Sequence, residues 1–407
     1  MPSLTRRALL SKLAFSATAS AAAEAGGHTL ICVFLRGGAD TLNMWVPYAD
    51  DRYYRLRPSL AIKAPGSDSA AAIKLNDRYA LHPAMQPLEA AFKEGRLGVV
   101  QSVGVDNTSG SHFECQDQME HGDSMSGQPA GGGWLGRFQR LRATDKQSPL
   151  SAVAIGTALP ESLRGAPSVS VLEHINDIAI KAPSGDPTGI VNALHALYGA
   201  DATLLGERGR ETIDLFKRVS ALQEKGYTPE NGAEYPKDEF GNGLREVSRL
   251  VKARLGLEVA CIDVGGWDTH FFQGNSAGLQ AARIKSLADG LAAFEMDMKA
   301  HRARYTIMVT TEFGRRVYEN ASLGTDHGRG FAFMALGDRV KGGQVLGSWP
   351  IKADDDVNVN TPGPGGLQTE TDFRHVFAEV LGGSIGLTEP IAAKLFPNFT
   401  PKKVGLM

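Results

Sequence analysis

An acid and a histidine stand two residues apart in the stretch "DVGGWDTH", directly after the short apolar run "LEVACI". Carboxylate oxygens and imidazole nitrogens are common ligands of divalent metals, so Asp268 and His270 could hold an ion. An apolar run of this length is typical of a buried strand, which places both residues where the strand ends. Three interpretations are open: a metal site, a site for an ester, or an ordinary loop.

Other polar segments stand next to apolar runs in the same way. They are "RGGADTLN" (36–43), "DNTSGSHFECQDQ" (106–118), "TTEFGRR" (310–316) and "GTDHGRG" (324–330). In an open parallel sheet, ligands bind at the carboxyl ends of the strands, so these segments can meet at one edge. Bringing carboxylates and imidazoles together there costs free energy unless a charged ligand, such as a metal ion, is bound between them. A site for Zn, Mn, Ca or Mg is the simplest explanation.

Each residue also has an ordinary structural explanation. Asp40 is in good turn sequence, and Ser109 or Ser111 could cap the helix that starts near His112. Arg315 could simply form a salt bridge. A hydrolase with a Ser, His and acid triad remains a second possibility, although the chain has no G-x-S-x-G motif.

The elements that must position these residues can be predicted from hydrophobic periodicity. Apolar runs suited to buried parallel strands are 28–35, 95–104, 150–156, 257–266, 305–314 and 330–337. Apolar residues at helical spacing lie between them. This alternation predicts an α/β fold with a mostly parallel central sheet flanked by helices. The stretch 185–256 is helical in pattern and is predicted to be an insertion.

Composition excludes some classes of protein. The chain has 407 residues, of which 42% are hydrophobic and 22% charged, with a formal net charge of -2. This is ordinary for a globular protein and gives no indication of nucleic-acid binding. After a leader is removed, 26–407 is long enough for one large domain. No stretch of that mature chain reaches the roughly 20 apolar residues that a membrane span requires.

The N-terminus has the pattern of an export signal. Arg6 and Arg7 precede a mildly apolar stretch, and "AEA" ends at Ala25 as a small-residue cleavage site. The paired arginines resemble a twin-arginine signal, which predicts passage through the twin-arginine export machinery in a folded state. An ordinary secretory signal is the alternative. Both predict a signal peptide over 1–25 and a periplasmic or extracellular protein.

Several long motifs resemble a family of exported bacterial proteins known as domain of unknown function 1501. They include "VFLRGGADTLNMWVPYADDRYYRLRPSLAI", "SGSHFECQDQME", "DVGGWDTH", "TEFGRRVYENASLGTDHGRG" and "TDFRHVFAEVLG". The resemblance runs from about residue 28 to 390. That family is grouped with the alkaline-phosphatase-like superfamily of phosphatases, sulfatases and phosphodiesterases, so the resemblance implies an alkaline-phosphatase-like α/β fold.

The resemblance also implies a set of metal ligands. The aspartate after the first strand is matched by Asp40, and the acid and histidine after a later strand by Asp268 and His270. Glu312 stands for the acid of an Asp-His pair in many members, and His327 matches the last histidine.

In the same comparison the nucleophile lies at a helix N-terminus, matched by Ser111 with Ser109 in reserve. His112 or Arg315 would steady the oxyanion. Phe313 replaces the histidine of the Asp-His pair, so a single metal, or a site with altered ligands, is expected instead of a two-zinc site. The start of a helix also presents free N–H groups that hold phosphate or sulfate.

Two functional hypotheses follow. The first is an exported, metal-dependent hydrolase or transferase acting on a phosphate or sulfate ester. The alternative is a non-catalytic exported protein with a degenerate site that binds a glycan, an envelope polymer or a partner protein.

Overall fold

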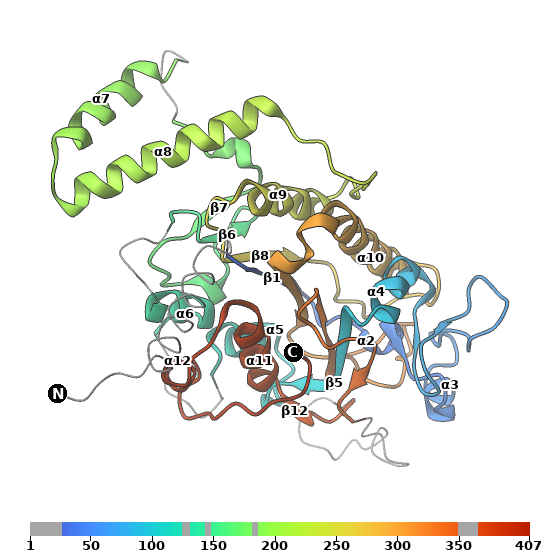
Figure 1. The fold of residues 1–407 in the computed structure, drawn as a ribbon. Coiled ribbons are helices and arrows are strands. Elements are labelled where there is room, and N and C mark those ends of the chain that lie inside the picture. The colour runs from blue at the N-terminus through green and yellow to red at the C-terminus, as the bar shows by residue number, and fades with distance from the viewer. Residues whose placement is uncertain (1–26, 124–130, 143–147, 181–185, 349–364) are drawn as a thin grey trace, which may run out of the picture.

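The predicted strands form one central sheet (Figure 1). The computed structural model describes residues 27–123, 131–142, 148–180, 186–348 and 365–407, so the predicted signal peptide lies outside the described residues. The six predicted strands correspond to β1 (Thr29–Leu35), β5 (Leu97–Gly104), β6 (Ala152–Ile155), β8 (Val259–Val264), β9 (Tyr305–Thr311) and β10 (Phe331–Leu336). Short strands are β7 (Ser170–Leu172), β11 (Val345–Leu346) and β12 (Thr371–Asp372). The order is β11-β5-β10-β9-β1-β8-β6-β7, and β12 also pairs with β5.

The sheet is mostly parallel, with one reversed strand. β10 runs antiparallel to both β5 and β9, so the prediction of a parallel strand over 330–337 was wrong. A parallel return needs a crossover to the other end of the sheet, usually through a helix. The link from Thr311 to Phe331 contains no helix and stays at one edge, so β10 starts where β9 ends. His327 is thereby brought to the carboxyl end of β9.

Three central strands end level with one another. Leu35 of β1 pairs with Val264 of β8 and with Thr311 of β9. The loops that follow these strands therefore leave the sheet from the same edge, which is where the polar segments of the sequence were predicted to meet.

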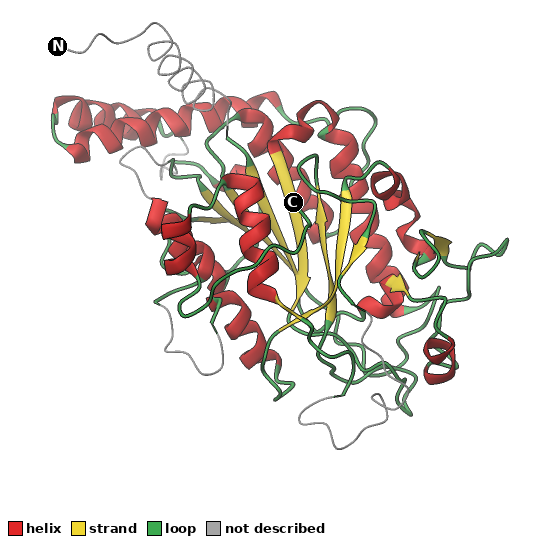
Figure 2. Ribbon diagram, turned by 60° about the horizontal axis from the view of Figure 1, so that its bottom comes forward, coloured by secondary structure: helices red, strands yellow, loops and turns green. Residues whose placement is uncertain are grey.

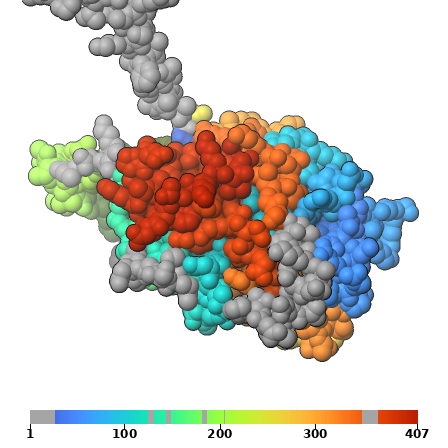
Figure 3. Space-filling view, turned by 90° about the horizontal axis from the view of Figure 1, so that it is seen from below, coloured from blue at the N-terminus to red at the C-terminus, as the bar shows by residue number. Residues whose placement is uncertain are grey.

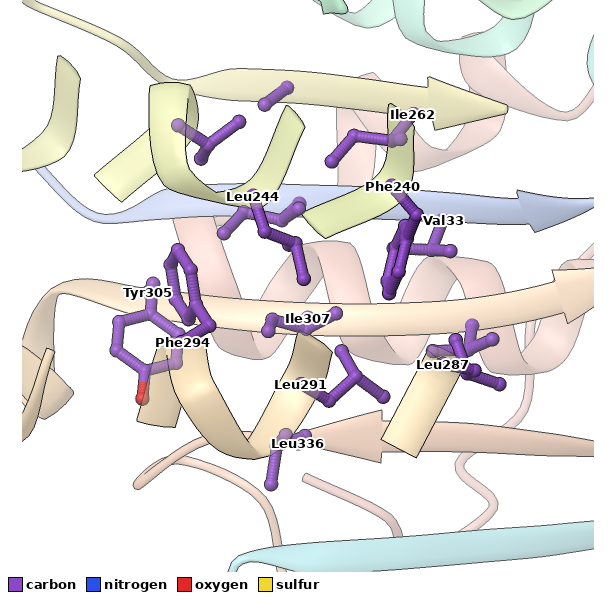
Figure 4. Close-up of a cluster of buried hydrophobic side chains, with 14 of the residues drawn as sticks. Val33, Phe240, Leu244, Ile262, Leu287, Leu291, Phe294, Tyr305, Ile307 and Leu336 are labelled. Atoms are coloured by element: carbon purple, nitrogen blue, oxygen red, sulfur yellow. The ribbon is translucent and has the colours of Figure 1, made fainter. Parts of the chain in front are cut away.

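One face of the sheet is covered by α9 (Glu239–Ala253), α10 (Leu279–Asp297), η1 (Pro83–Leu88) and α4 (Glu89–Lys93). Figure 4 shows Phe240 and Leu244 of α9 and Leu291 of α10 packed over Val33 and Ile307 of the strands. Apolar side chains at helical spacing thus bury one stripe of each helix against the alternating inward side chains of the strands.

The other face carries α5 (His112–His121), α6 (Trp134–Arg142), α11 (Phe373–Ile385) and α12 (Glu389–Leu395). The C-terminal segment, red in Figure 3, forms a continuous cover on this side. Helices therefore lie on both faces of the sheet, as Figure 2 shows in red around yellow strands. The predicted α/β class, with a mostly parallel central sheet flanked by helices, is confirmed.

The segment 185–256 contains three helices with different surroundings. α7 (Thr188–Ala200) and α8 (Leu204–Lys225) form a hairpin that projects from the body (Figure 1), whereas α9 packs on the sheet. The projecting part of the predicted insertion is thus the α7–α8 hairpin.

The remaining elements are short. They are α2 (Thr41–Met44), α3 (Asp51–Leu56), η2 (Glu161–Leu163), η3 (Ile175–Asp177), η4 (Lys299–Arg304) and a small antiparallel sheet of β2 (Trp45–Val46), β4 (Ala80–Leu81) and β3 (Ile73–Lys74). Within the described ranges, no helix combines the length and apolar character needed to cross a bilayer.

Candidate metal centre

Four side chains meet at the carboxyl edge of the sheet. Asp268 and His270 follow β8, His327 precedes β10, and His112 opens α5. The Nε2 atoms of His270 and His327 lie 3.0 and 3.2 Å from Oδ1 of Asp268. The Nε2 of His112 lies 3.6 Å from the other oxygen of Asp268. His112, Asp268 and His327 each offer an atom within 4.8 Å of the others, which is close enough to share one ion.

Each histidine is held by its other ring nitrogen. The Nδ1 of His112 is 2.7 Å from Oε1 of Glu312, and that of His270 is 2.9 Å from Oδ1 of Asp326. The Nδ1 of His327 is 2.8 Å from the carbonyl oxygen of Gly110. Because a carboxylate or carbonyl oxygen only accepts, each Nδ1 donates its proton. In the neutral rings the lone pair is then on Nε2, which faces the cluster.

This arrangement fits a metal ion. Ligand atoms 2.0–2.1 Å from a tetrahedral Zn would be roughly 3.3–3.4 Å apart, and the separations from Asp268 of 3.0, 3.2 and 3.6 Å bracket that value. The Nε2 of His112 is buried and has no hydrogen-bond partner among the described residues. A ring nitrogen donating to a carboxylate or carbonyl is the usual support of a metal-bound histidine.

The pKa shifts of Asp268 and His327 favour the protonation states that bind metal, whereas the shift of His112 favours the protonated ring, which a metal would have to displace a proton to bind. Burial lowers the pKa of His327 and so favours its neutral form. Burial opposes ionisation of Asp268, but the hydrogen bond from Arg315 and the neighbouring histidines outweigh it and lower its pKa. The hydrogen bond to Glu312 raises the pKa of His112. Asp268 is therefore an anion that faces the largely neutral imidazole of His327, and both are in the form that binds metal.

Phe313 occupies the place next to the cluster where a second histidine could have been. Its ring centroid is 4.9 Å from that of His112 and 4.7 Å from that of His327. The side chain is buried and cannot bind an ion. The side chains beside Phe313 thus offer donor atoms for one metal ion. Phe313 itself offers no donor for a second ion.

A pocket open to solvent lies against the cluster. Its lining residues are Thr108, Ser109, Gly110, His270, Arg316, Asp326 and His327. The Nε of Arg316 is buried with no hydrogen-bond partner among the described residues, and its guanidinium lies over the ring of Tyr318. A cation and two of the cluster histidines therefore border the same opening.

The sequence of the chain matches the model of one protein family. A model described as "Protein of unknown function (DUF1501)" matches residues 28–395. The chain belongs to this family. No curated protein is detectably similar to this DUF1501 member in sequence.

Several solved structures are remotely similar to this DUF1501 chain. The C-terminal periplasmic domain of EcEptC from Escherichia coli, in complex with Zn, is 11% identical, with a TM-score of 0.35 over 94% of this chain and 93% of that one. Ps i-CgsB in complex with k-i-k-neocarrahexaose is 9% identical, with a TM-score of 0.38 over 90% and 74%. Alkaline phosphatase from the Antarctic bacterium TAB5 is 10% identical, with a TM-score of 0.29 over 76% and 91%.

Asp40 was predicted to bind the metal, but the structure places it behind the cluster. Both its oxygens accept from Arg57, at 2.5 and 3.0 Å, and one also accepts from Gln273 at 2.7 Å. Gln273 in turn accepts from the hydroxyls of Thr269 and Thr325. Asp40 thus fixes the two loops that carry His270 and His327 and presents no free oxygen to an ion.

Glu312 was also predicted to bind the metal. It is fully buried, and its Oε1 accepts from Gly37 N, from Gln116 Nε2 and from His112 Nδ1. Since it contacts the Nδ1 of His112, it lies on the far side of that ring from the cluster. In this DUF1501 chain Glu312 orients the ring of His112. The hydrogen bonds from His112 and Gln116 outweigh its burial and lower its pKa, so it accepts as an anion.

Arg315 was predicted to steady an oxyanion, but its side chain is fully buried. It donates to Asp268 at 2.6 Å and to the carbonyl oxygens of Trp267 and Thr325 at 3.2 and 2.8 Å. It also donates to the carbonyls of Gly37 and Gly38. The residue ties three loops together and positions Asp268, with no donor directed to the pocket.

The two predicted serines have different surroundings. Ser111 is the N-cap of α5, and its hydroxyl accepts from Glu114 N at 3.5 Å. Ser109 lines the pocket, and its hydroxyl accepts from Ser111 N at 3.2 Å. Sequence reasoning missed Asp326 and Arg316, although each directly adjoins a residue that it had selected, His327 and Arg315.

The loop after β1 passes close beneath the cluster. Gly37 has a φ of +119°, and a Cβ at this position would lie 2.6 Å from the backbone nitrogen of Asp268. Only glycine adopts this conformation at such a distance without strain. The "RGGAD" segment is thus shaped to let the loop that carries Asp268 pass over it.

Proposed function

We propose that this protein is an exported, metal-dependent hydrolase or transferase acting on a phosphate or sulfate ester. The proposal rests on one observation: the Nε2 atoms of His270 and His327 lie 2.9 Å apart while both Nδ1 atoms donate elsewhere. Two lone pairs facing each other at this distance repel unless a cation lies near them. Asp268 supplies the negative charge on the same side.

The ligands we propose are Asp268, His327 and His112, whose ligand atoms lie within 4.8 Å of one another, with His270, 3.0 Å from Asp268, as a fourth donor that the substrate can replace. Three nitrogen donors and one oxygen donor suit Zn better than Ca or Mg, which prefer oxygen. Such an ion would act as a Lewis acid on an ester oxygen and neutralise charge that develops on the reacting group.

The protein's own groups around the pocket fit an anionic ester. Arg316 adds a positive charge at the rim, and a planar guanidinium can donate two parallel hydrogen bonds to phosphate or sulfate oxygens. The N-terminus of α5 begins at the adjoining segment, where the helix dipole is positive. These groups would hold the ester with its reacting atom toward the cluster.

We place the nucleophile on the segment before α5. Ser109 is among the residues that line the pocket, whereas Ser111 is not and caps α5. Ser109 is therefore our first candidate for attack on the ester, and Ser111 is the second. Attack would form a bond from the serine oxygen to phosphorus or sulfur while the bond to the leaving alcohol oxygen breaks. The hydroxyl proton would pass to water in the open pocket, and the leaving oxygen would take a proton from water. A second water molecule, or an acceptor alcohol in a transferase, would then displace the serine and free it.

A non-catalytic binding protein is the second candidate function. Four protein ligands close a tetrahedral site, as in structural zinc sites, and Phe313 leaves no second metal position at its place. On this alternative the metal stabilises the loops, and the pocket binds a glycan, an envelope polymer or a partner protein.

The two functions separate in one set of measurements. Protein purified without chelator would be assayed for metal by mass spectrometry and for turnover of aryl phosphate monoesters, aryl phosphate diesters and aryl sulfates with Zn, Mn, Ca or Mg. About one transition metal per chain, together with turnover that a chelator abolishes, supports the enzyme. Metal without turnover of any ester supports the binding protein, and a chain that binds no metal contradicts the proposed centre.

Export in a folded state is part of the proposal. It rests on Arg6, Arg7 and the small-residue site that ends at Ala25. Replacing both arginines by lysine should leave the protein in the cytoplasm with its signal uncleaved. Normal export of that variant would contradict the twin-arginine route and leave ordinary secretion.

A further inference from the structure

Large apolar side chains stand exposed beside the candidate metal centre. Phe271 and Phe272 directly follow His270 and are 64% and 74% exposed, and Leu323, on the loop that leads to His327, is 44% exposed. Single exposed apolar residues are common on protein surfaces, but a group of them on the loops that carry two pocket-lining residues, His270 and His327, indicates a binding surface.

Backbone hydrogen bonds join these residues into one platform. Phe272 N donates to Ser322 O at 3.0 Å, and Gln273 N donates to Leu323 O at 2.9 Å. Asn320 donates from its side chain to His270 O at 2.8 Å and to Asp326 Oδ1 at 3.0 Å. The platform of Phe271, Phe272 and Leu323 is thus attached to the same loops that carry two of the proposed ligands.

The platform is held in an unfavourable backbone conformation. Phe272 has a φ of 47° and Leu323 a φ of 58°, in the left-handed region that bulky residues rarely adopt. Glycine or asparagine would fit these positions with less strain. Residues kept in such a conformation are concentrated at functional sites, where the surrounding structure enforces it. Exposed phenyl and isobutyl groups gain nothing from burial here, so folding alone does not explain them.

We propose that the platform binds the hydrocarbon part of the substrate, so that the ester is an amphiphile with an anionic head and a long alkyl or acyl chain. This rests on the proposed function, because the head must reach the cluster. Arg316 and the histidines border the pocket, and the apolar platform continues from His270. Charged and apolar surfaces side by side match the two parts of such a molecule.

The test uses two non-hydrolysable probes, ethylphosphonate and dodecylphosphonate. Calorimetry measures the binding of each to the zinc-loaded protein, with dodecylphosphonate kept below its critical micelle concentration. Burying two methylene groups is worth roughly tenfold in affinity. Dodecylphosphonate should therefore bind the wild type at least tenfold more tightly than ethylphosphonate. Dodecyl maltoside, which has the same chain without the anion, should bind weakly.

Phe272→Asn is the informative variant, because asparagine tolerates a positive φ. It should be at least as thermally stable as the wild type, bind ethylphosphonate unchanged and lose most of the preference for the longer chain. Phe271→Ser should lose part of the preference. Leu197→Ser is the matched control, since Leu197 is 63% exposed on the projecting α7, and it should change neither affinity.

Each other outcome has a defined meaning. If both phosphonates bind equally, or Phe272→Asn keeps the full preference, the platform is not the hydrocarbon site, while the proposed function stands. If dodecyl maltoside binds as tightly as dodecylphosphonate, the surface is a general apolar one that suits a membrane or a partner protein, and the inference is overturned. If neither phosphonate binds, the inference and the proposed function both fail.

Discussion

His270 and His327 face each other with 2.9 Å between their Nε2 atoms, although each donates its Nδ1 proton to another acceptor. Metal-free protein can keep this geometry only with a proton or another cation near the pair. The cluster is therefore expected to be less stable empty than loaded, and its metal affinity should appear as folding stability.

Metal removal should lower the melting temperature. A ligand that binds only the folded chain adds about 2.7 kcal/mol at a hundredfold excess over its Kd. Chelator-treated protein should thus melt several degrees lower and recover with Zn, as measured by calorimetry. His327→Ala should melt at the same temperature with and without Zn. If neither chelator nor Zn changed the melting temperature of the wild type, the proposed metal centre would be contradicted.

Glu312 should tune metal affinity without binding the ion. Glu312→Gln removes the charge that orients His112, and loss of such a support typically weakens metal binding 10- to 100-fold. Zinc competition with a chromophoric chelator would measure the change. Glu207→Gln, on the exposed side of α8, is the control and should have wild-type affinity. Complete loss of binding in folded Glu312→Gln would indicate a direct ligand instead.

The position of the site could be predicted from the sequence because it depends on the direction in which each strand runs through the sheet. Asp268 and His270 follow β8, and β8 ends level with β1 and β9, so the rule that parallel strands gather their loops at one edge was sufficient. His327 reaches this edge for another reason, the reversal of β10, which the apolar pattern of that strand does not reveal.

The roles of individual residues could not be predicted, because they depend on side-chain direction. Glu312 directly follows β9, but its carboxylate is directed into the sheet edge toward Gly37 and Gln116. Asp40 is neutralised by Arg57, 17 residues away, and nothing in their spacing indicates a buried pair. His112 reaches the cluster only because of how α5 packs on the sheet.

The Asp40 ion pair should matter for stability. Asp40→Asn leaves the buried charge of Arg57 without its counter-ion, and removing one partner of a buried pair costs about 3–5 kcal/mol. Denaturant unfolding of the zinc-loaded protein would measure this loss. Asp68→Asn breaks the exposed pair with Lys63 and should leave the free energy of unfolding nearly unchanged, because solvent screens such a pair. Equal effects of the two variants would contradict the structural role of Asp40.

His28 should make stability depend on pH. Burial, with the charge of Arg339 adding to it, lowers its pKa from 6.5 to about 4. Between these values the unfolded chain binds a proton that the folded chain does not, so stability is full above pH 6.5 and falls as pH drops toward 4. At about 1.4 kcal/mol for each pKa unit, the loss is about 3 kcal/mol.

His28→Gln isolates this contribution from that of other histidines. The variant cannot bind the proton, so its stability should fall about 3 kcal/mol less than that of the wild type between pH 6.5 and 4, as measured by urea unfolding. Parallel pH profiles for the two proteins would show that His28 is not the group responsible.

The two serines before α5 should respond to substitution in opposite ways. Ser111→Ala removes an N-cap and should cost about 1 kcal/mol of stability, while turnover of the best ester from the screen stays within a few-fold of the wild type. Ser109→Ala should leave stability nearly unchanged and lower turnover roughly a thousandfold, because it removes the proposed attacking hydroxyl of a residue that lines the pocket. Both variants should keep the zinc content of the wild type, since neither serine touches a proposed ligand side chain. If Ser111→Ala is the inactive one, the nucleophile is the capping serine. If both remain active, the attacking group is a water molecule and the serines serve only the start of the helix.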